Sequence, residues 1–162
     1  MRPAMLVGCL MLASAGAACS SSSAPVISSP IVGTWIASEA LHPTGSMTTQ
    51  IGFTESGLFM YSGVSYGIYP GQSAGTASAY TQISGTYQID GDRLTITGNR
   101  TATWDSFYGA NSPARVENVN TEVFKDARFR IVAGTLILDY LTYPADAPVP
   151  TTESFTRLIP ID

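Results

Sequence analysis

The chain has 162 residues, which is the length of a single domain. Hydrophobic residues make up 44 % of the chain and charged residues only 12 %, so there is enough apolar material for one core. The net charge of -4 argues against a nucleic-acid-binding protein, because a phosphate backbone is bound by clustered Lys and Arg. No such cluster stands in the sequence.

Residues 1–18 have the features of an export signal. Arg2 supplies a positive charge at the start, and an apolar run from Met5 to Ala13 follows it. This run is shorter than the ~20 apolar residues that a membrane-spanning helix needs. The segment therefore predicts a signal peptide rather than a transmembrane helix.

The small residues Gly16-Ala17-Ala18 before Cys19 resemble the end of a bacterial lipoprotein signal. This resemblance implies that Cys19 becomes the diacylated, palmitate-carrying N-terminus of the mature chain. Ser20 after the cysteine implies sorting to the outer membrane, on its periplasmic or surface face. The alternative is ordinary secretion after cleavage near Ala18, which gives a soluble secreted or periplasmic protein.

A serine- and proline-rich segment, residues 19–30, separates the signal from the rest of the chain. Such a composition is typical of a flexible tether. Both cysteines, Cys9 and Cys19, precede residue 31. We therefore expect a folded domain over residues 31–162 that has neither a disulfide nor a thiolate metal site.

The predicted domain is all-β, because turn signals recur about every 8 to 12 residues and no helical periodicity appears. Such a pattern is typical of a β-sandwich or β-barrel, and we expect about eight strands. The predicted strands are Val32–Ala40, Met47–Phe53, Leu58–Tyr61, Thr81–Asp90, Arg93–Thr97, Thr101–Tyr108, Val123–Val132, Thr135–Tyr143 and Thr151–Ile159.

Three longer connections are predicted between these strands. Residues 62–79 are rich in Gly, Ser and Tyr, residues 109–121 contain Asn and Pro, and residues 144–150 carry three prolines, which cannot donate to a sheet ladder. The first connection has two interpretations. It is either an adaptable contact surface of the kind that antibody loops provide or an irregular hairpin.

Residue alternation along the strands predicts which side chains point inward. Side chains two positions apart in a strand share a face, and the apolar set falls on one face of each strand. The predicted inward residues are Ile51, Phe53, Tyr87, Leu94, Ile96, Phe129, Leu138 and Phe155.

Gly33-Thr34-Trp35 near the start and Phe155-Thr156-Arg157 near the end resemble the lipocalin and calycin pattern. This resemblance implies a lipocalin-like, antiparallel up-and-down β-barrel of about eight strands. It also implies that Arg157 covers Trp35 as a plug at one end of the barrel. A guanidinium stacked on an indole contributes about 0.5 to 2 kcal/mol, so the pair is expected to be structural.

The sequence gives no support for catalysis. Gly71-Gln72-Ser73-Ala74-Gly75 has the spelling of a nucleophile elbow, but that motif needs a strand, a helix and a later histidine. The one histidine, His42, lies upstream. No metal, cofactor or enzyme activity is therefore expected. Four aspartates fall in predicted turns or at isolated strand positions and therefore give no acid–base pair: Asp90, Asp92, Asp126 and Asp139.

The expected function is ligand binding by a membrane-anchored lipoprotein. An eight-stranded barrel is just wide enough to be packed by side chains or to hold one small ligand. A small hydrophobic ligand would be lined by Phe53, Tyr87, Phe129 and Phe155. The alternative is a protein-interaction or protease-inhibitor-like module of the cell envelope, with a filled barrel and residues 62–79 as its contact surface.

Overall fold

The computed structural model describes residues 29–41, 45–145 and 147–159. The predicted signal peptide, Cys19 and His42 lie outside these residues. Within them, no helix is long and apolar enough to cross a membrane. The described elements are β1 (Gly33–Leu41), β2 (Gly45–Phe53), β3 (Leu58–Tyr66), β4 (Ala77–Asp90), β5 (Arg93–Asp105), the 3₁₀ turn η1 (Ser106–Tyr108), β6 (Arg115–Val123), β7 (Lys125–Val132), β8 (Thr135–Ala145) and β9 (Ala147–Arg157).

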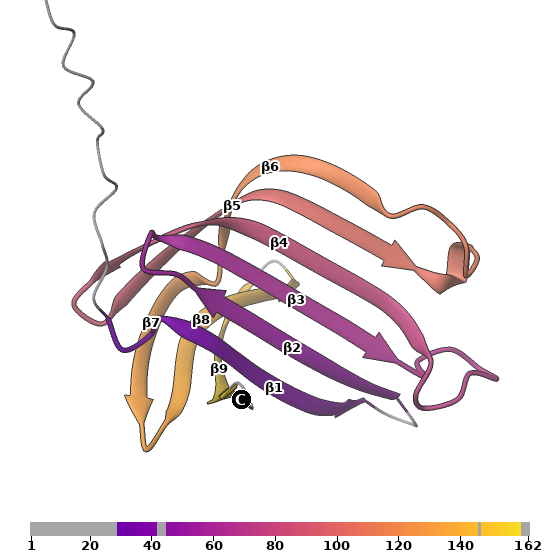
Figure 1. The fold of residues 1–162 in the computed structure, drawn as a ribbon, viewed down its shortest axis with the longest axis horizontal. Coiled ribbons are helices and arrows are strands. Elements are labelled where there is room, and N and C mark those ends of the chain that lie inside the picture. Colours follow the sequence, from indigo (N-terminus) through magenta and orange to yellow (C-terminus); the bar gives the residue numbers. More distant parts are fainter. Residues whose placement is uncertain (1–28, 42–44, 146, 160–162) are drawn as a thin grey trace, which may run out of the picture.

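The strands form a closed antiparallel barrel in which neighbours in the sequence are mostly neighbours in space (Figure 1). The order runs from β4 through β3, β2, β1, β9, β8 and β7 to β5, and pairing of β4 with β5 completes the ring. β6 is an additional strand that pairs with β5. The predicted all-β, up-and-down barrel of about eight strands is therefore confirmed.

The edge of β5 is shared by two strands. Near the start of β5, Arg93 is paired with Arg128 of β7, and the amide of Phe129 donates to the carbonyl of Asp92 at 2.8 Å. Farther along, β6 takes over the pairing from Ile96 onward. Phe124, with φ 56°, connects β6 to β7. The ring is thus completed at the end where β1 begins, which we call the plug end, and β6 follows β5 toward the opposite loop end (Figure 1).

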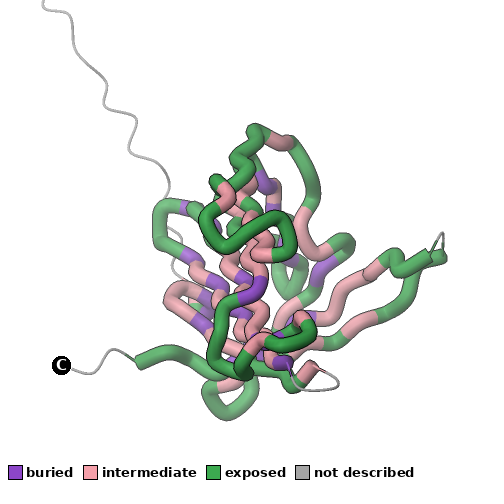
Figure 2. The backbone as a smooth tube through the Cα atoms, turned by 90° about the vertical axis from the view of Figure 1, so that its right-hand side faces the viewer, coloured by how far each residue is buried: buried purple, intermediate pink, exposed green. Residues whose placement is uncertain are grey.

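The core fills the barrel on the side of the plug end. The predicted inward residues are confirmed: all but Phe129 are buried, and Phe129 is half-buried and packs against the others. Figure 2 shows these buried positions within the body of the barrel, with exposed segments at the loops. The fully buried apolar set is Ile31, Trp35, Ile51, Phe53, Phe59, Tyr87, Leu94, Ile96, Ala127, Leu136, Leu138 and Phe155.

The predicted long connection over residues 62–79 is wrong at both ends, and the segment is a hairpin that is partly strand. β3 continues to Tyr66 and β4 begins at Ala77, so only residues 67–76 connect them. Gly63 lies within β3 and faces the interior, where a Cβ would lie 2.9 Å from the hydroxyl of Tyr61. A glycine at this position therefore makes room for the neighbouring tyrosine ring.

The other two predicted loops are also partly strand. β6 begins at Arg115 inside the predicted loop 109–121, and in the predicted loop 144–150 β8 extends to Ala145 and β9 begins at Ala147. The prolines are tolerated in β9 because its first residues pair with β8 alone, while β1 contacts β9 only near Arg157. The two predicted strands over 93–97 and 101–108 form one strand, β5, with an irregularity between Gly98 and Arg100, but this strand ends at Asp105, and residues 106–108 form η1.

Candidate functional site

Trp35 and Arg157 meet at the plug end. The β1–β9 register places them opposite each other, and the guanidinium carbon lies 5.0 Å from the centre of the tryptophan ring. The indole nitrogen donates to the carbonyl of Ile31 at 2.8 Å. The guanidinium donates to the carbonyls of Pro30, at 3.3 Å, and Val32. Trp35 is 1 % exposed, so the pair holds the start of β1 over the core.

Gly33 belongs to the same structure. Its φ of +135° is a backbone conformation that side chains with a Cβ rarely adopt. A Cβ at this position would also lie 3.1 Å from the Nη2 atom of Arg157. The Gly-Thr-Trp motif is therefore explained by packing beneath Arg157.

The four residues predicted to line a cavity lie in or against the core. Phe53 and Tyr87 form an edge-to-face pair with ring centres 5.0 Å apart, and Phe155 is fully buried. The hydroxyl of Tyr87 donates to the carbonyl of Thr54 at 2.7 Å. Phe129 packs against this cluster from β7. A ligand-lining role for these four residues stays a prediction, and the structure shows them as part of the core or packed against it.

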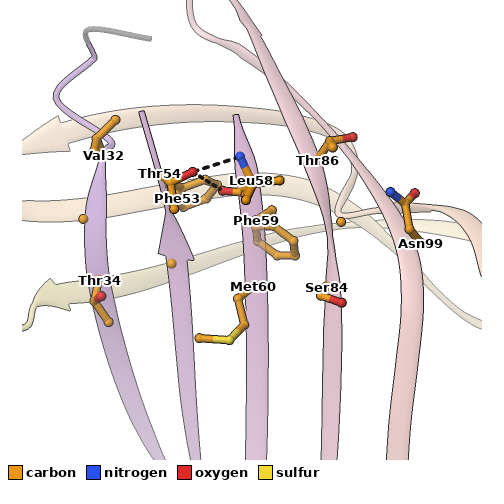
Figure 3. Close-up of a pocket in the computed structure, with 13 residues that line it drawn as sticks. Val32, Thr34, Phe53, Thr54, Leu58, Phe59, Met60, Ser84, Thr86 and Asn99 are labelled. Carbon is orange, nitrogen blue, oxygen red and sulfur yellow. Dashed lines mark hydrogen bonds between the residues drawn. The ribbon is translucent and has the colours of Figure 1, made fainter. Parts of the chain in front are cut away.

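A groove of about 610 Å³ lies on the outer face of β1 to β5 (Figure 3). The strand register places Thr34, Gly52, Met60 and Ser84 side by side across its floor. Gly52 creates the depression, because a Cβ at this position would have no neighbour within 4 Å. Met60 and the adjacent Leu58 are 43 % and 53 % exposed. The groove thus presents two large apolar side chains to solvent.

The groove carries no ionisable side chain. Its polar atoms are hydroxyls, peptide groups and the amide of Asn99, and the hydroxyl of Thr54 accepts from the amide of Leu58 at 3.0 Å, which fixes the turn at one side (Figure 3). The volume falls within the ~300 to 1,000 Å³ of small-molecule sites. The lining residues are Val32, Gly33, Thr34, Gly52, Phe53, Thr54, Leu58, Phe59, Met60, Ser84, Gly85, Thr86 and Asn99.

A second surface feature is the aromatic turn η1 at the loop end. Phe107 and Tyr108 are 74 % and 79 % exposed. Asp105 holds the turn: its carboxylate accepts the amide of Phe107 at 2.8 Å and the hydroxyl of Tyr69 at 2.7 Å. The hydrogen bond from the hydroxyl of Tyr69 to Asp105 raises the pKa of Tyr69. Gln72 adds a bond to Ser106 at 3.0 Å, so residues 67–76 are tied to the turn.

Ser73 and Asp139 lie apart from the other residues considered for catalysis, whereas Asp90 and Asp126 line one surface pocket beside Arg93 and Glu122. The hydroxyl of Ser73 bonds to that of Thr76 at 2.7 Å within the connection between β3 and β4, and no strand-to-helix elbow surrounds it. Asp92, Asp126 and Asp139 each form an ion pair with an arginine at the surface. Asp90 ends β4 and is exposed. Within the described residues, no group of three or more potential ligands could hold a metal ion.

The sequence did not lead us to predict the groove. Leu58 and Met60 are two apolar residues that stand two positions apart, so the sequence did indicate that they share one face of a strand. Their alignment with Gly52 depends on the register between β2 and β3, and no local pattern specifies it. Comparisons of the chain with protein-family models, curated proteins and solved structures find no match.

Proposed function

We propose that this protein is a membrane-anchored lipoprotein with a lipocalin-like barrel that binds a small, uncharged, apolar ligand. The observation that carries the binding function is the outer groove of about 610 Å³, which has no ionisable side chain and exposes Leu58 and Met60. The anchor is supported by the signal-like sequence before Cys19. The lipocalin-like character is supported by the barrel and by the contact between Trp35 and Arg157.

Binding is favoured because a ligand would remove exposed apolar side chains of the groove from water. Leu58 and Met60 remain about half exposed in the free protein, and covering the exposed half contributes roughly half of the ~1.5 to 3 kcal/mol that full burial of such a side chain gives. Met60 can adapt its unbranched chain to ligands of different shape. The hydroxyls of Thr34, Ser84 and Thr86 stay available to orient a ligand that has a polar end.

The test fills the groove. Gly52→Leu places a side chain into open space on the outer face, so it should leave the fold intact while it occupies the ligand's position. We expect the affinity for N-phenyl-1-naphthylamine, an uncharged apolar fluorescent probe, to fall about tenfold or more, equivalent to ~1.4 kcal/mol. Gly75→Leu is the matched control, because a Cβ there also meets open space but lies away from the groove. Equal probe affinity in wild type and Gly52→Leu would refute the groove as the site.

A protein-interaction function is the second candidate. The aromatic turn presents Phe107 and Tyr108 on a backbone held by Asp105. Aromatic residues that are exposed on a fixed support are typical of protein-binding surfaces, because little side-chain entropy is lost on contact. This surface and the groove lie on different parts of the barrel, so both functions are compatible.

A further inference from the structure

The inner face of the barrel combines a carboxylate with aromatic rings. Glu153 of β9 is paired with Leu138 of β8, and residues opposite each other in an antiparallel pair point to the same side. Leu138 is fully buried in the core, so Glu153 points inward. The hydroxyl of Tyr140 donates to Glu153 Oε2 at 3.1 Å. A carboxylate is therefore held inside the barrel by a tyrosine.

Two further aromatic side chains, Phe124 and Tyr61, continue from Tyr140 on the inner face. The ring centre of Phe124 is 4.8 Å from that of Tyr140 and 6.1 Å from that of Tyr61, both in edge-to-face geometry. Phe124 thus contacts both tyrosines, and Tyr140 is hydrogen-bonded to Glu153, so the four side chains form one cluster. Each of them is only half-buried, so part of each side chain is open to solvent.

The charge around Glu153 is unbalanced. Burial raises the pKa of its carboxyl, the hydrogen bond from Tyr140 lowers it, and the neighbouring carboxylate of Glu39 raises it again. Within the described residues no basic side chain forms an ion pair with Glu153. Six basic residues of the described chain have partners elsewhere: Arg93 with Asp126, Arg115 with Glu117, Lys125 with Glu122, Arg128 with Asp92, Arg130 with Asp139, and Arg157 with Trp35. Arg100 lies opposite Ser84, a residue of the outer groove.

We propose that this cluster of Tyr61, Phe124, Tyr140 and Glu153, the inner acidic site, binds an organic cation, an amine or quaternary ammonium group on an apolar body. The charge of the ligand would lie against Glu153 and the faces of the rings, which attract cations through their quadrupoles. This site goes beyond the proposed function, because the groove has no charge and lies on the opposite face of the sheet. The two sites therefore prefer different ligands.

The test compares three ten-carbon probes below their micelle concentrations: decyltrimethylammonium, 1-decanol and decanoate. We expect the inner acidic site to prefer the cation over both others in isothermal titration with the full chain. Glu153→Gln keeps the shape and removes the charge, and it should weaken binding of the cation about tenfold or more, the size of a lost charge-assisted contact. Glu55→Gln removes an exposed charge from the turn between β2 and β3 and should leave this affinity unchanged.

A site-specific readout comes from Met47. Its methyl group and the hydroxyl of Tyr61 both approach the position where Gly63 would carry a Cβ, at 3.2 and 2.9 Å. We expect decyltrimethylammonium to shift the methyl NMR signal of Met47, assigned with Met47→Leu, and Phe124→Leu to weaken the binding. Equal affinity of Glu153→Gln and wild type, or a shift at Met60 in place of Met47, would overturn the inner site. These results leave the groove intact, since its test rests on Gly52→Leu.

Discussion

At the scale of single residues, Trp35 and Arg157 act as one unit at the plug end. The guanidinium lies over the indole and donates to two carbonyls that precede β1, including Pro30. Loss of the ring removes a buried side chain, and it also removes the surface on which the guanidinium stacks. The effects of the two residues should therefore overlap.

The first prediction is a double-mutant cycle. Trp35→Ala should lower the free energy of unfolding by about 3 to 5 kcal/mol, the typical cost of removing a buried tryptophan. Arg157→Ala should cost about 0.5 to 2 kcal/mol, the range of a cation–π contact. The double variant should lose less than the sum, as measured by urea unfolding. Strict additivity would show that the stacking contact contributes nothing.

Individual residues were predicted well where the pattern was local. Phe155 and Arg157 stand two apart in one strand, so their shared face followed from the sequence, whereas the contact of Arg157 with Trp35 was implied by the lipocalin resemblance. Glu153 has the same parity and its inward direction was equally readable. The role proposed for Glu153 depends on Tyr61, which lies 92 residues earlier in the sequence. The two residues come near each other only because the barrel closes, and no local pattern predicts this.

At the scale of elements, the connections differ most from the sequence-based expectation. Glycine, serine and proline indicated loops at residues 62–79 and 144–150, yet much of both segments is paired strand. Amino-acid composition reflects the local conformational preference of a segment, whereas β pairing depends on partner strands that are distant in sequence. The aromatic turn is the reverse case, since Phe107 was expected in a strand and lies in η1.

The second prediction concerns this turn. Asp105 accepts both the amide of Phe107 and the hydroxyl of Tyr69, so Asp105→Ala removes two bonds at once. The loss of such a capping side chain costs about 0.5 to 2 kcal/mol. We expect faster amide hydrogen exchange at Phe107 and Gly109, whose amides are bonded within the turn, while the amides of β2 keep their protection. Unchanged exchange at Phe107 would contradict the role of Asp105.

At the scale of the whole molecule, the barrel has a filled half and a half lined by polar and aromatic groups. The buried core lies toward the plug end, and the inner acidic site lies beyond it. The all-β class was predictable, because regular turns and alternating residues indicate successive strands, whereas the up-and-down barrel was what the lipocalin resemblance implied. The additional strand β6 was not predictable, since it depends on how β5 divides its edge between two partners.

The third prediction concerns the anchor. Cys19→Ala should move the protein from the membrane fraction to the soluble fraction and abolish labelling with radioactive palmitate, because the proposed lipid is attached at that residue. Cys9→Ala is the matched control and should leave both properties unchanged. Palmitate labelling that persists in Cys19→Ala would refute the assignment of Cys19.

The most direct test of the proposed function is methyl NMR of the methionines during titration with 1-decanol. Met60 lies in the groove and Met47 on the inner face. Met60→Leu and Met47→Leu assign their signals among those of the full chain. The groove predicts a saturable shift of the Met60 signal while the Met47 signal stays in place. A Met60 signal that does not move up to the solubility limit of the alcohol would contradict the proposed binding function.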